Sequence, residues 1–165
     1  MNGGTGMDNV NIIRSGFYAL DFALPDTQGN IFRLRNDLNG HFTALCFFPD
    51  GENEKVNGYL KDLNQGLPPN AVGMPIKLVG ICPKRGDRLR DLKEKLKLNF
   101  PLLSDSKLVV ASKYHVWDRN SPRPSVYFSV FIVDDYAVIR HRVSEVPGLS
   151  KYVPDELRMT ISKLI

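Results

Sequence analysis

The sequence contains few of the residues that build disulfide frameworks or metal sites. Only two cysteines, Cys46 and Cys82, occur among 165 residues, which is too few for the disulfide framework of a small secreted protein. The three histidines, His41, His115 and His141, stand far apart, and none has a second ligand at a metal-binding spacing. We therefore predict a protein of a reducing compartment, the cytoplasm, with no metal or other cofactor.

The sequence also lacks long apolar runs. No run reaches the roughly 18 residues that cross a bilayer, and residues 1–13 have neither the basic segment nor the apolar core of a secretory signal. We interpret residues 1–15 as a flexible leader or a cloning remnant. Residues 16–165 are predicted to form one domain, because their length and composition, with 42% hydrophobic and 24% charged residues in the chain, suit a single globular unit.

Positive charge is concentrated in one segment. The net charge of +4 can be assigned to residues 84–97, where lysine and arginine outnumber acidic residues. A basic helix can bind phosphate, so a nucleic acid or an acidic partner is one hypothesis. However, Leu89, Leu92 and Leu96 recur at helical spacing, and no aromatic residues interleave with the basic ones to stack on bases. We therefore interpret the charges as the solvated face of an amphipathic helix and do not expect nucleic-acid binding.

The order of the expected elements predicts an α/β fold. A β-hairpin is expected at residues 22–34, strands at 43–48, 77–82, 126–133 and 137–144, and helices at 53–66, 84–97, 105–114 and from 154 onward. Two apolar strands that are each followed by a helix require a parallel crossover, and parallel strands end at the same edge of a sheet. Pro49 and Cys82 are therefore expected at one edge of a central mixed sheet with flanking helices.

Several segments, in their order and spacing, resemble the peroxiredoxins, the AhpC/TSA family of thioredoxin-like thiol peroxidases. They are residues 22–30, 47–49, 79–82, 99–105 followed by 114–116, and 131–135. The resemblance covers about residues 16–165 and implies a thioredoxin-like fold of the peroxiredoxin type. Within the family, the chain is most similar to the bacterioferritin-comigratory (peroxiredoxin Q) branch, which implies a monomer or a homodimer.

The resemblance places the catalytic positions of this family on residues that lack its chemistry. The family motif Pro-x3-Thr-x2-Cys falls on Pro49, Asn53 and Val56, and the family arginine falls on Phe128. A peroxiredoxin needs a thiolate nucleophile and an arginine that lowers the thiol pKa and stabilises the developing negative charge. The resemblance therefore implies that the peroxidatic cysteine is absent, and we expect Val56 and Phe128 to close the pocket between them.

Two hypotheses about function follow, and the sequence alone leaves open whether the protein is an enzyme. In the first, the protein is a binding or regulatory pseudoenzyme with a protein partner of unknown identity. In the second, it is an antioxidant thiol peroxidase or oxidoreductase that reduces hydroperoxides through Cys82, with an external thiol such as thioredoxin or glutathione as reductant.

The second hypothesis depends on the surroundings of the two thiols. Cys82 ends a strand beside two basic residues and before a helix, and this positive charge would favour a thiolate. Cys46 lies inside a strand and is interpreted as buried packing. Arg123 and Arg140 are not far from Phe128 in the sequence, so that a displaced arginine also stays open.

Overall fold

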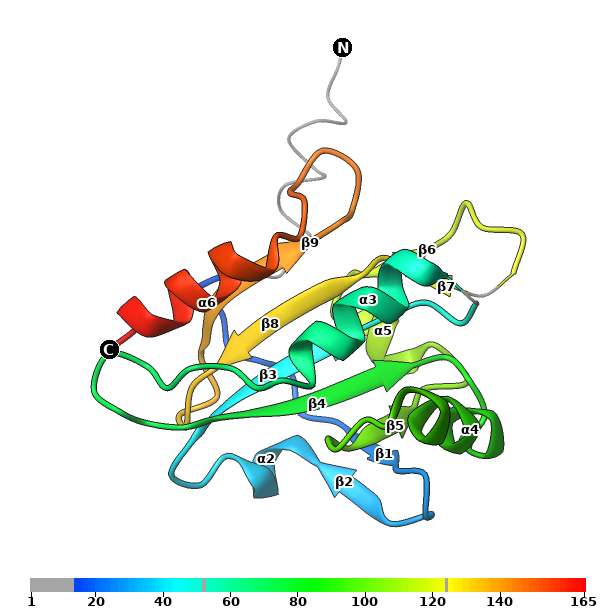
Figure 1. Cartoon of the computed structure of the whole chain (residues 1–165), viewed down its shortest axis with the longest axis horizontal. Coiled ribbons are helices and arrows are strands. Elements are labelled where there is room, and N and C mark those ends of the chain that lie inside the picture. The colour runs from blue at the N-terminus through cyan, green and yellow to red at the C-terminus, as the bar shows by residue number, and fades with distance from the viewer. Residues whose placement is uncertain (1–13, 52, 124) are drawn as a thin grey trace.

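The computed structural model describes residues 14–51, 53–123 and 125–165, so most of the predicted leader lies outside the described residues. A five-stranded sheet runs through the centre of the molecule (Figure 1). Its strands, in spatial order, are β5 (Leu102–Ser104), β4 (Ile76–Cys82), β3 (Phe42–Phe47), β8 (Ser129–Val133) and β9 (Ile139–Ser144). Strands β3, β4 and β5 are parallel, whereas β8 and β9 run antiparallel to their neighbours. The predicted mixed sheet is confirmed.

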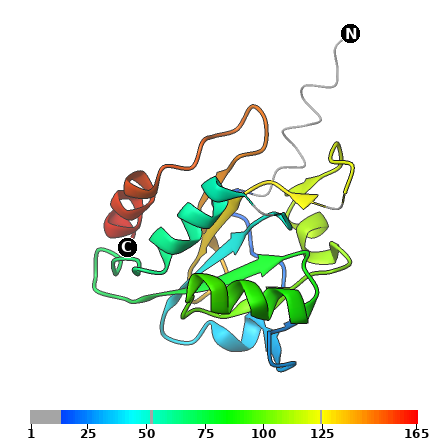
Figure 2. The ribbon, with the colours of Figure 1, turned by 45° about the vertical axis from the view of Figure 1, so that its right-hand side comes forward.

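Helices cover both faces of the sheet (Figures 1 and 2). One face carries α3 (Glu54–Leu63), α4 (Gly86–Leu96) and α6 (Pro154–Lys163); the other carries α2 (Leu34–Asp37), α5 (Val109–Lys113) and the hairpin of β1 (Ala23–Pro25) and β2 (Ile31–Arg33). Because successive strand residues point to opposite faces, Leu45 and Phe47 join one hydrophobic cluster while Ala44 and Cys46 join the other. Among the described residues, no helix is both long enough and apolar enough to span a bilayer.

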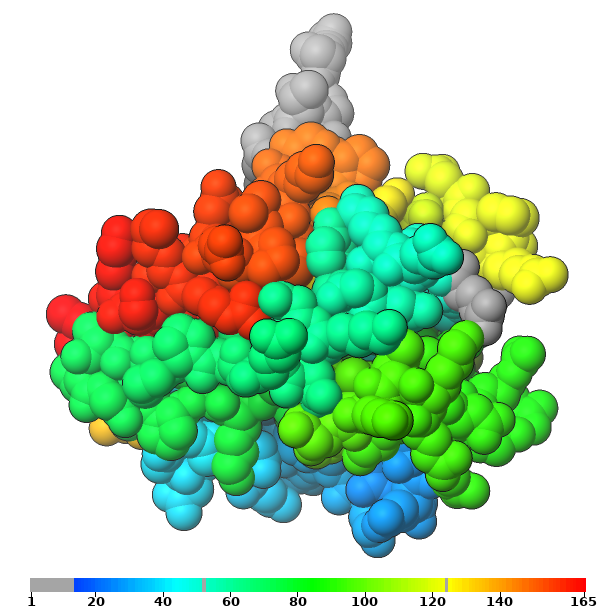
Figure 3. All heavy atoms as spheres, viewed as in Figure 1, coloured from blue at the N-terminus to red at the C-terminus, as the bar shows by residue number. Residues whose placement is uncertain are grey.

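Helix α3 begins where the sequence predicts. The side chain of Asn53 accepts hydrogen bonds from the backbone N–H groups of Lys55 and Val56, at 3.0 and 3.2 Å, which is the geometry of an N-cap. The helix ends earlier than predicted, because its C-cap is Asn64 and Gly66 lies in the following turn with a φ of 102°. Figure 3 shows α3 at the surface between α6 and α4.

The strand predicted at residues 126–133 is two strands. β7 (Ser125–Val126) pairs with β6 (Trp117–Asp118) in a separate two-stranded sheet, whereas β8 pairs with β3 and β9. Tyr127 and Phe128 lie between them, where the chain changes partners. An apolar, β-favouring run cannot reveal this change, because both halves have the same pattern. Phe128 lies outside both strands, and its ring packs against Tyr59 of α3.

The helix predicted from Asp105 is shorter than expected. Asp105 does not begin the helix; α5 starts four residues later. The carboxylate nevertheless accepts hydrogen bonds from the N–H groups of Val110 and Ala111, at 3.2 and 2.8 Å. Burial raises the pKa of Asp105, although these hydrogen bonds oppose the shift. Asp105 therefore caps α5 from outside the helix.

Candidate functional site

The carboxyl ends of β3 and β4 lie together, as the sequence predicts. Phe47 pairs with Ile81 in parallel register, so the chain leaves both strands at the same edge of the sheet. The Cys82 thiol donates a weak hydrogen bond to the carbonyl oxygen of Pro49, with Sγ 3.8 Å from that oxygen. This edge is where open α/β sheets bind their ligands, because the loops there leave the sheet in different directions. The expected juxtaposition of Pro49 and Cys82 is confirmed.

Asn53 and Val56 both have structural roles in α3. The side-chain oxygen of Asn53 is engaged by two backbone N–H groups of the first turn. Val56 is 6% exposed and belongs to the hydrophobic cluster between α3 and the sheet. Neither side chain offers a nucleophile, and the capping hydrogen bonds hold the Asn53 oxygen toward the helix rather than toward a ligand.

Phe128 belongs to a group of three mutually packed rings that we call the aromatic cluster: Tyr59 of α3, Phe128, and Tyr152 just before α6. The ring centroids lie 4.7 Å apart for Tyr59 and Phe128, 4.7 Å for Tyr59 and Tyr152, and 4.9 Å for Phe128 and Tyr152. These separations are typical of favourable aromatic pairs. Phe128 is 3% exposed, and Val56 lies one helical turn before Tyr59 in the same hydrophobic cluster. The β8 side of α3 is therefore filled.

Glu145 joins the aromatic cluster to its surroundings. One carboxylate oxygen accepts hydrogen bonds from the Tyr59 hydroxyl and the Tyr152 backbone N–H, each at 3.3 Å. The other lies 3.5 Å from the amino group of Lys55, whose pKa is raised chiefly by this negative charge. The backbone N–H of Glu145 donates to the carbonyl oxygen of Phe128 at 2.8 Å. These contacts fix α3, the end of β9 and the approach to α6 relative to one another.

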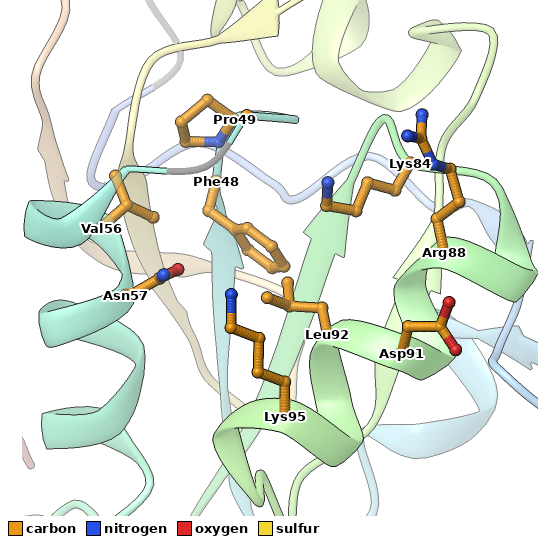
Figure 4. Close-up of a pocket in the computed structure, with 10 residues that line it drawn as sticks. Phe48, Pro49, Val56, Asn57, Lys84, Arg88, Asp91, Leu92 and Lys95 are labelled. Carbon is orange, nitrogen blue, oxygen red and sulfur yellow. The ribbon is translucent and has the colours of Figure 1, made fainter.

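The opposite side of the first turn of α3 is open. A cavity of about 350 Å³, which we call the α3–α4 cavity, lies between the start of α3 and the length of α4 (Figure 4). Its volume lies within the range of small-molecule sites. The lining residues are Phe48, Pro49, Gly51, Val56, Asn57, Lys84, Arg88, Asp91, Leu92 and Lys95. Apolar side chains thus form part of the wall, and three basic side chains stand against one carboxylate.

Two basic side chains of the α3–α4 cavity flank its apolar part. In Figure 4 the amino groups of Lys84 and Lys95 lie on either side of the Phe48 ring, and the Asn57 amide points into the same space from α3. Lys84 forms an ion pair with Asp50, with 2.8 Å between the amino group and a carboxylate oxygen. This pair also ties the loop after β3 to the end of β4.

Both thiols are fully buried and free. Burial raises the pKa of Cys82 to about 12 and also raises that of Cys46. The positive charge of Lys84 lowers the Cys82 pKa, but the negative charge of Asp50 opposes it, and burial outweighs both. The expectation that neighbouring positive charge favours a thiolate at Cys82 is therefore not supported, because the Lys84 amino group is paired with Asp50 and Cys82 is fully buried.

Arg123 and Arg140, the two candidates for a displaced catalytic arginine, lie in different parts of the structure. Arg123 lines a second hollow, of about 450 Å³, together with Pro49 and Asn53. Arg140 stands at the start of β9, at the opposite end of the sheet, 3.6 Å from the carboxylate of Asp134. Arg123 therefore reaches the loop that follows β3, and Arg140 does not.

Sequence reasoning missed the aromatic cluster and the α3–α4 cavity. Tyr152 carried no signal, because a single aromatic residue in a loop has no periodicity. The residues of α4 did carry one: Arg88, Leu92 and Lys95 lie at i, i+4 and i+7, which places them on one face of the helix. The sequence pattern assigns Leu92 to the apolar stripe and the charges of Arg88 and Lys95 to the solvated face, and only the packing of α4 beside α3 places all three on one cavity.

Comparison with known proteins identifies the class. The model of the AhpC/TSA family matches residues 16–142, and the chain belongs to this family. It is 26% identical over 146 residues to Peroxiredoxin Bcp of Escherichia coli (strain K12), covering 80% of this chain and 86% of that protein. It is 34% identical over 122 residues to a putative peroxiredoxin bcp of Buchnera aphidicola subsp. Schizaphis graminum, covering 74% and 76%. The predicted resemblance to the bacterioferritin-comigratory branch is confirmed.

Solved structures support the same conclusion about the fold. The crystal structure of Peroxidoxin BcpB from Mycobacterium tuberculosis superposes with a TM-score of 0.75 at 21% identity, covering 90% of this chain and 96% of that one. At this identity the likeness concerns the fold. The predicted thioredoxin-like fold of the peroxiredoxin type, a mixed sheet with flanking helices and an N-terminal hairpin, is confirmed.

Proposed function

We propose that this peroxiredoxin-family protein does not reduce peroxides by the family reaction and acts instead by binding, as a regulatory pseudoenzyme. The observation that carries the proposal is the aromatic cluster. The resemblance assigns the catalytic cysteine to Val56 and the catalytic arginine to Phe128, and three packed rings occupy the space beside Val56 on that side of α3. A peroxide that approached Val56 from this side would have to displace Tyr59 or Tyr152, and on the open side Val56 meets the α3–α4 cavity, whose lining, among the described residues, contains no thiol.

The chemistry of peroxide reduction supports the same proposal. A thiolate must attack one peroxide oxygen, the O–O bond must break, and water or an alcohol must leave with a proton. The position assigned to the thiolate holds a hydrocarbon side chain, and the Asn53 amide is engaged as a helix cap. The cysteines present, Cys46 and Cys82, are buried with raised pKa values. No group at the assigned positions can start this sequence.

A peroxide-consumption assay tests the proposal. The purified protein is mixed with dithiothreitol and either hydrogen peroxide or cumene hydroperoxide, with a Bcp-type peroxiredoxin assayed in parallel. We expect consumption at the rate of the buffer control. The Cys46→Ser and Cys82→Ser variants correct for stoichiometric oxidation of buried thiols. Multiple turnovers per protein molecule in the wild type would contradict the proposal.

A second candidate function is a thiol peroxidase that uses Cys82. It is favoured by the position of the sulfur at the ligand-binding edge of the sheet, beside Pro49. The Cys82 thiolate would attack one peroxide oxygen, the O–O bond would break, and water or an alcohol would leave with a proton while Cys82 becomes a sulfenic acid. Two equivalents of an external thiol, such as glutathione, or one thioredoxin dithiol would then restore the thiol, release water and leave as a disulfide. Burial and the raised pKa of Cys82 oppose this function.

Alkylation kinetics distinguish the two functions. Iodoacetamide labelling is measured on the Cys46→Ser variant, which keeps only Cys82, and on the Cys82→Ser variant, which keeps only Cys46. The pseudoenzyme proposal predicts slow labelling of both variants in buffer and fast labelling of both in denaturant. Labelling of Cys82 at least about tenfold faster than that of Cys46, with loss of peroxide consumption in Cys82→Ser, would instead support the second function.

The partner and the assembly state belong to the same proposal. We propose a cytoplasmic monomer or homodimer whose protein partner is not yet identified, and mass measurement in solution tests the assembly state. Nucleic acid is a weaker candidate. The cations of α4 serve different local contacts: Arg90 donates to the backbone carbonyl of Thr27 at 2.8 and 3.1 Å, while others line the α3–α4 cavity. A salt-sensitive gel shift with DNA or RNA would favour the nucleic-acid alternative.

A further inference from the structure

We infer that the α3–α4 cavity binds a small organic anion. Its carboxylate or phosphate group would be held by Lys84, Arg88 and Lys95, and its apolar or aromatic body would lie against Phe48 and Leu92. This inference deepens the proposed binding function, on which it rests, by giving the ligand a chemical class and a location.

The apolar part of the cavity is a rigid surface. Phe48 is 1% exposed, and its ring lies against Gly80 of β4. A Cβ atom at Gly80 would stand 3.1 Å from Cε1 of Phe48 and 2.6 Å from Cδ2 of Leu102, so only glycine leaves room for the ring in this place. Leu92, half-buried on α4, adjoins the same space. A ligand ring or chain that covers the half-buried Leu92 would remove apolar surface from water, whereas the Phe48 ring is already buried and acts as a fixed wall.

One of the cations is held in place before any ligand arrives. The Lys84 side chain is 15% exposed and is fixed by its 2.8 Å ion pair with Asp50. Little side-chain entropy is therefore lost when Lys84 meets an anion. Arg88 and Lys95 stand two helical turns apart on the same face of α4, so they approach the cavity from its two ends. Arginine and lysine both pair with carboxylate and with phosphate, so the cavity suits either group.

The shape and the mixed lining narrow the ligand class. A volume of about 350 Å³ lies at the lower end of the range for small-molecule sites, which suits a compact molecule rather than a polymer strand. An inorganic anion would leave the apolar wall that includes Leu92 uncovered, whereas a neutral apolar molecule would bring no negative charge to Lys84, Arg88 and Lys95. The Asn57 amide, which points into the space from α3, adds one donor and one acceptor for a polar substituent.

Titration with four small probes tests the inference on the full chain. Benzoate and phenyl phosphate carry both an anion and an aromatic ring, benzyl alcohol lacks the charge, and inorganic phosphate lacks the ring. Backbone amide NMR shifts report affinity and place. We expect benzoate, phenyl phosphate or both to shift the signals of Asn57, Leu92 and Lys95, with affinity at least about fivefold above that of the two incomplete probes. The two anionic probes distinguish a carboxylate ligand from a phosphate ligand.

A pair of double variants separates the cavity from general charge attraction. Arg88→Gln with Lys95→Gln removes two cations from the cavity. Lys93→Gln with Lys97→Gln removes two from the same segment, but these line a different hollow beside Thr27 and Gln28. We expect the first pair to weaken binding by at least about fivefold and the second to leave it within about twofold.

Three results would overturn the inference: equal affinity for benzoate and benzyl alcohol, equal weakening by both double variants, or shifts centred away from the α3–α4 cavity. Equal affinity for inorganic phosphate and phenyl phosphate would overturn the organic part of the class. Peroxide consumption by the same preparation remains an independent measurement. Anion binding together with peroxide turnover would overturn only the proposed loss of the family reaction, and the absence of both would overturn only this inference.

Discussion

The two sides of the first turn of α3 differ in almost every physical property. On the β8 side, three aromatic rings and the Glu145 carboxylate close the space. On the α4 side, an apolar surface lies open and is flanked by Lys84, Arg88 and Lys95. Val56 takes part in both, because it belongs to the buried cluster and also lines the α3–α4 cavity. One residue thus separates a filled region from a hollow one.

This difference places a packed region and an open region side by side within one peroxiredoxin fold. Packed rings stabilise the native state, and they do so where the family resemblance places peroxide chemistry. An open hollow ringed by cations does little for stability, and local arrangements that do not help folding are expected at sites of function. The closed side should therefore respond to substitution through stability, and the open side through binding.

The largest effect is expected at the centre of the closed side. Phe128→Ala should lower the free energy of unfolding by about 3–5 kcal/mol, because it leaves a void between Tyr59 and Tyr152. Urea denaturation measures the loss. Tyr136→Ala is the control: its side chain is 80% exposed and should change stability by no more than about 0.5 kcal/mol. Similar small losses in both variants would mean that the aromatic cluster does not hold the closed side together.

The next largest loss of stability is expected for a substitution in β4, beside the Phe48 ring that lines the α3–α4 cavity. Gly80→Ala should lower the free energy of unfolding by about 1–3 kcal/mol, because the new methyl group meets Leu102, which is fully buried and has no room to retreat. The matched control is Gly58→Ala in α3, where a methyl group meets no atom within 4 Å. That substitution should raise stability by about 0.5–1 kcal/mol. A loss of stability in both the Gly80→Ala and Gly58→Ala variants would show that the loss at Gly80 does not come from the packing of Phe48 on β4.

A smaller effect is expected at the residue that begins α3. Asn53→Ala should lower the free energy of unfolding by about 1 kcal/mol, because two backbone N–H groups lose their acceptor. Asn53→Ser and Asn53→Asp should restore most of the loss, since either side chain can accept the same hydrogen bonds. If the alanine and serine variants were equally stable by urea denaturation, capping would not be the role of Asn53.

These roles were predictable where the signal is local. The sequence predicts the hairpin at residues 22–34, in whose turn Gly29 adopts a φ of 85°, and the helix start at residue 53, where Asn53 is the N-cap, because each depends on a few neighbouring residues. It also predicts that Pro49 and Cys82 meet, since parallel strands share an edge. The family and the thioredoxin-like fold follow from many such segments in the right order, even where single positions have changed.

The features that the sequence does not predict depend on contacts between segments that lie far apart in the chain. The break at Phe128 arises because the chain exchanges β6 for β3 as its partner, and no local pattern records that exchange. The pKa of Cys82 depends on burial and on Asp50, more than thirty residues away in the chain. The cavity needs α4 to lie beside α3, which the amphipathic pattern of α4 alone cannot specify.

The smallest effect on stability is expected for substitutions of cations that line the α3–α4 cavity. Arg88→Gln with Lys95→Gln should change the free energy of unfolding by no more than about 0.5 kcal/mol, because both side chains are exposed and charges in water contribute little to folding. The same pair is expected to weaken anion binding. Urea denaturation in low and high salt measures the first effect, with the Lys93→Gln, Lys97→Gln pair as control. A loss above about 1.5 kcal/mol would make these cations structural, and the open side would then resemble the closed one.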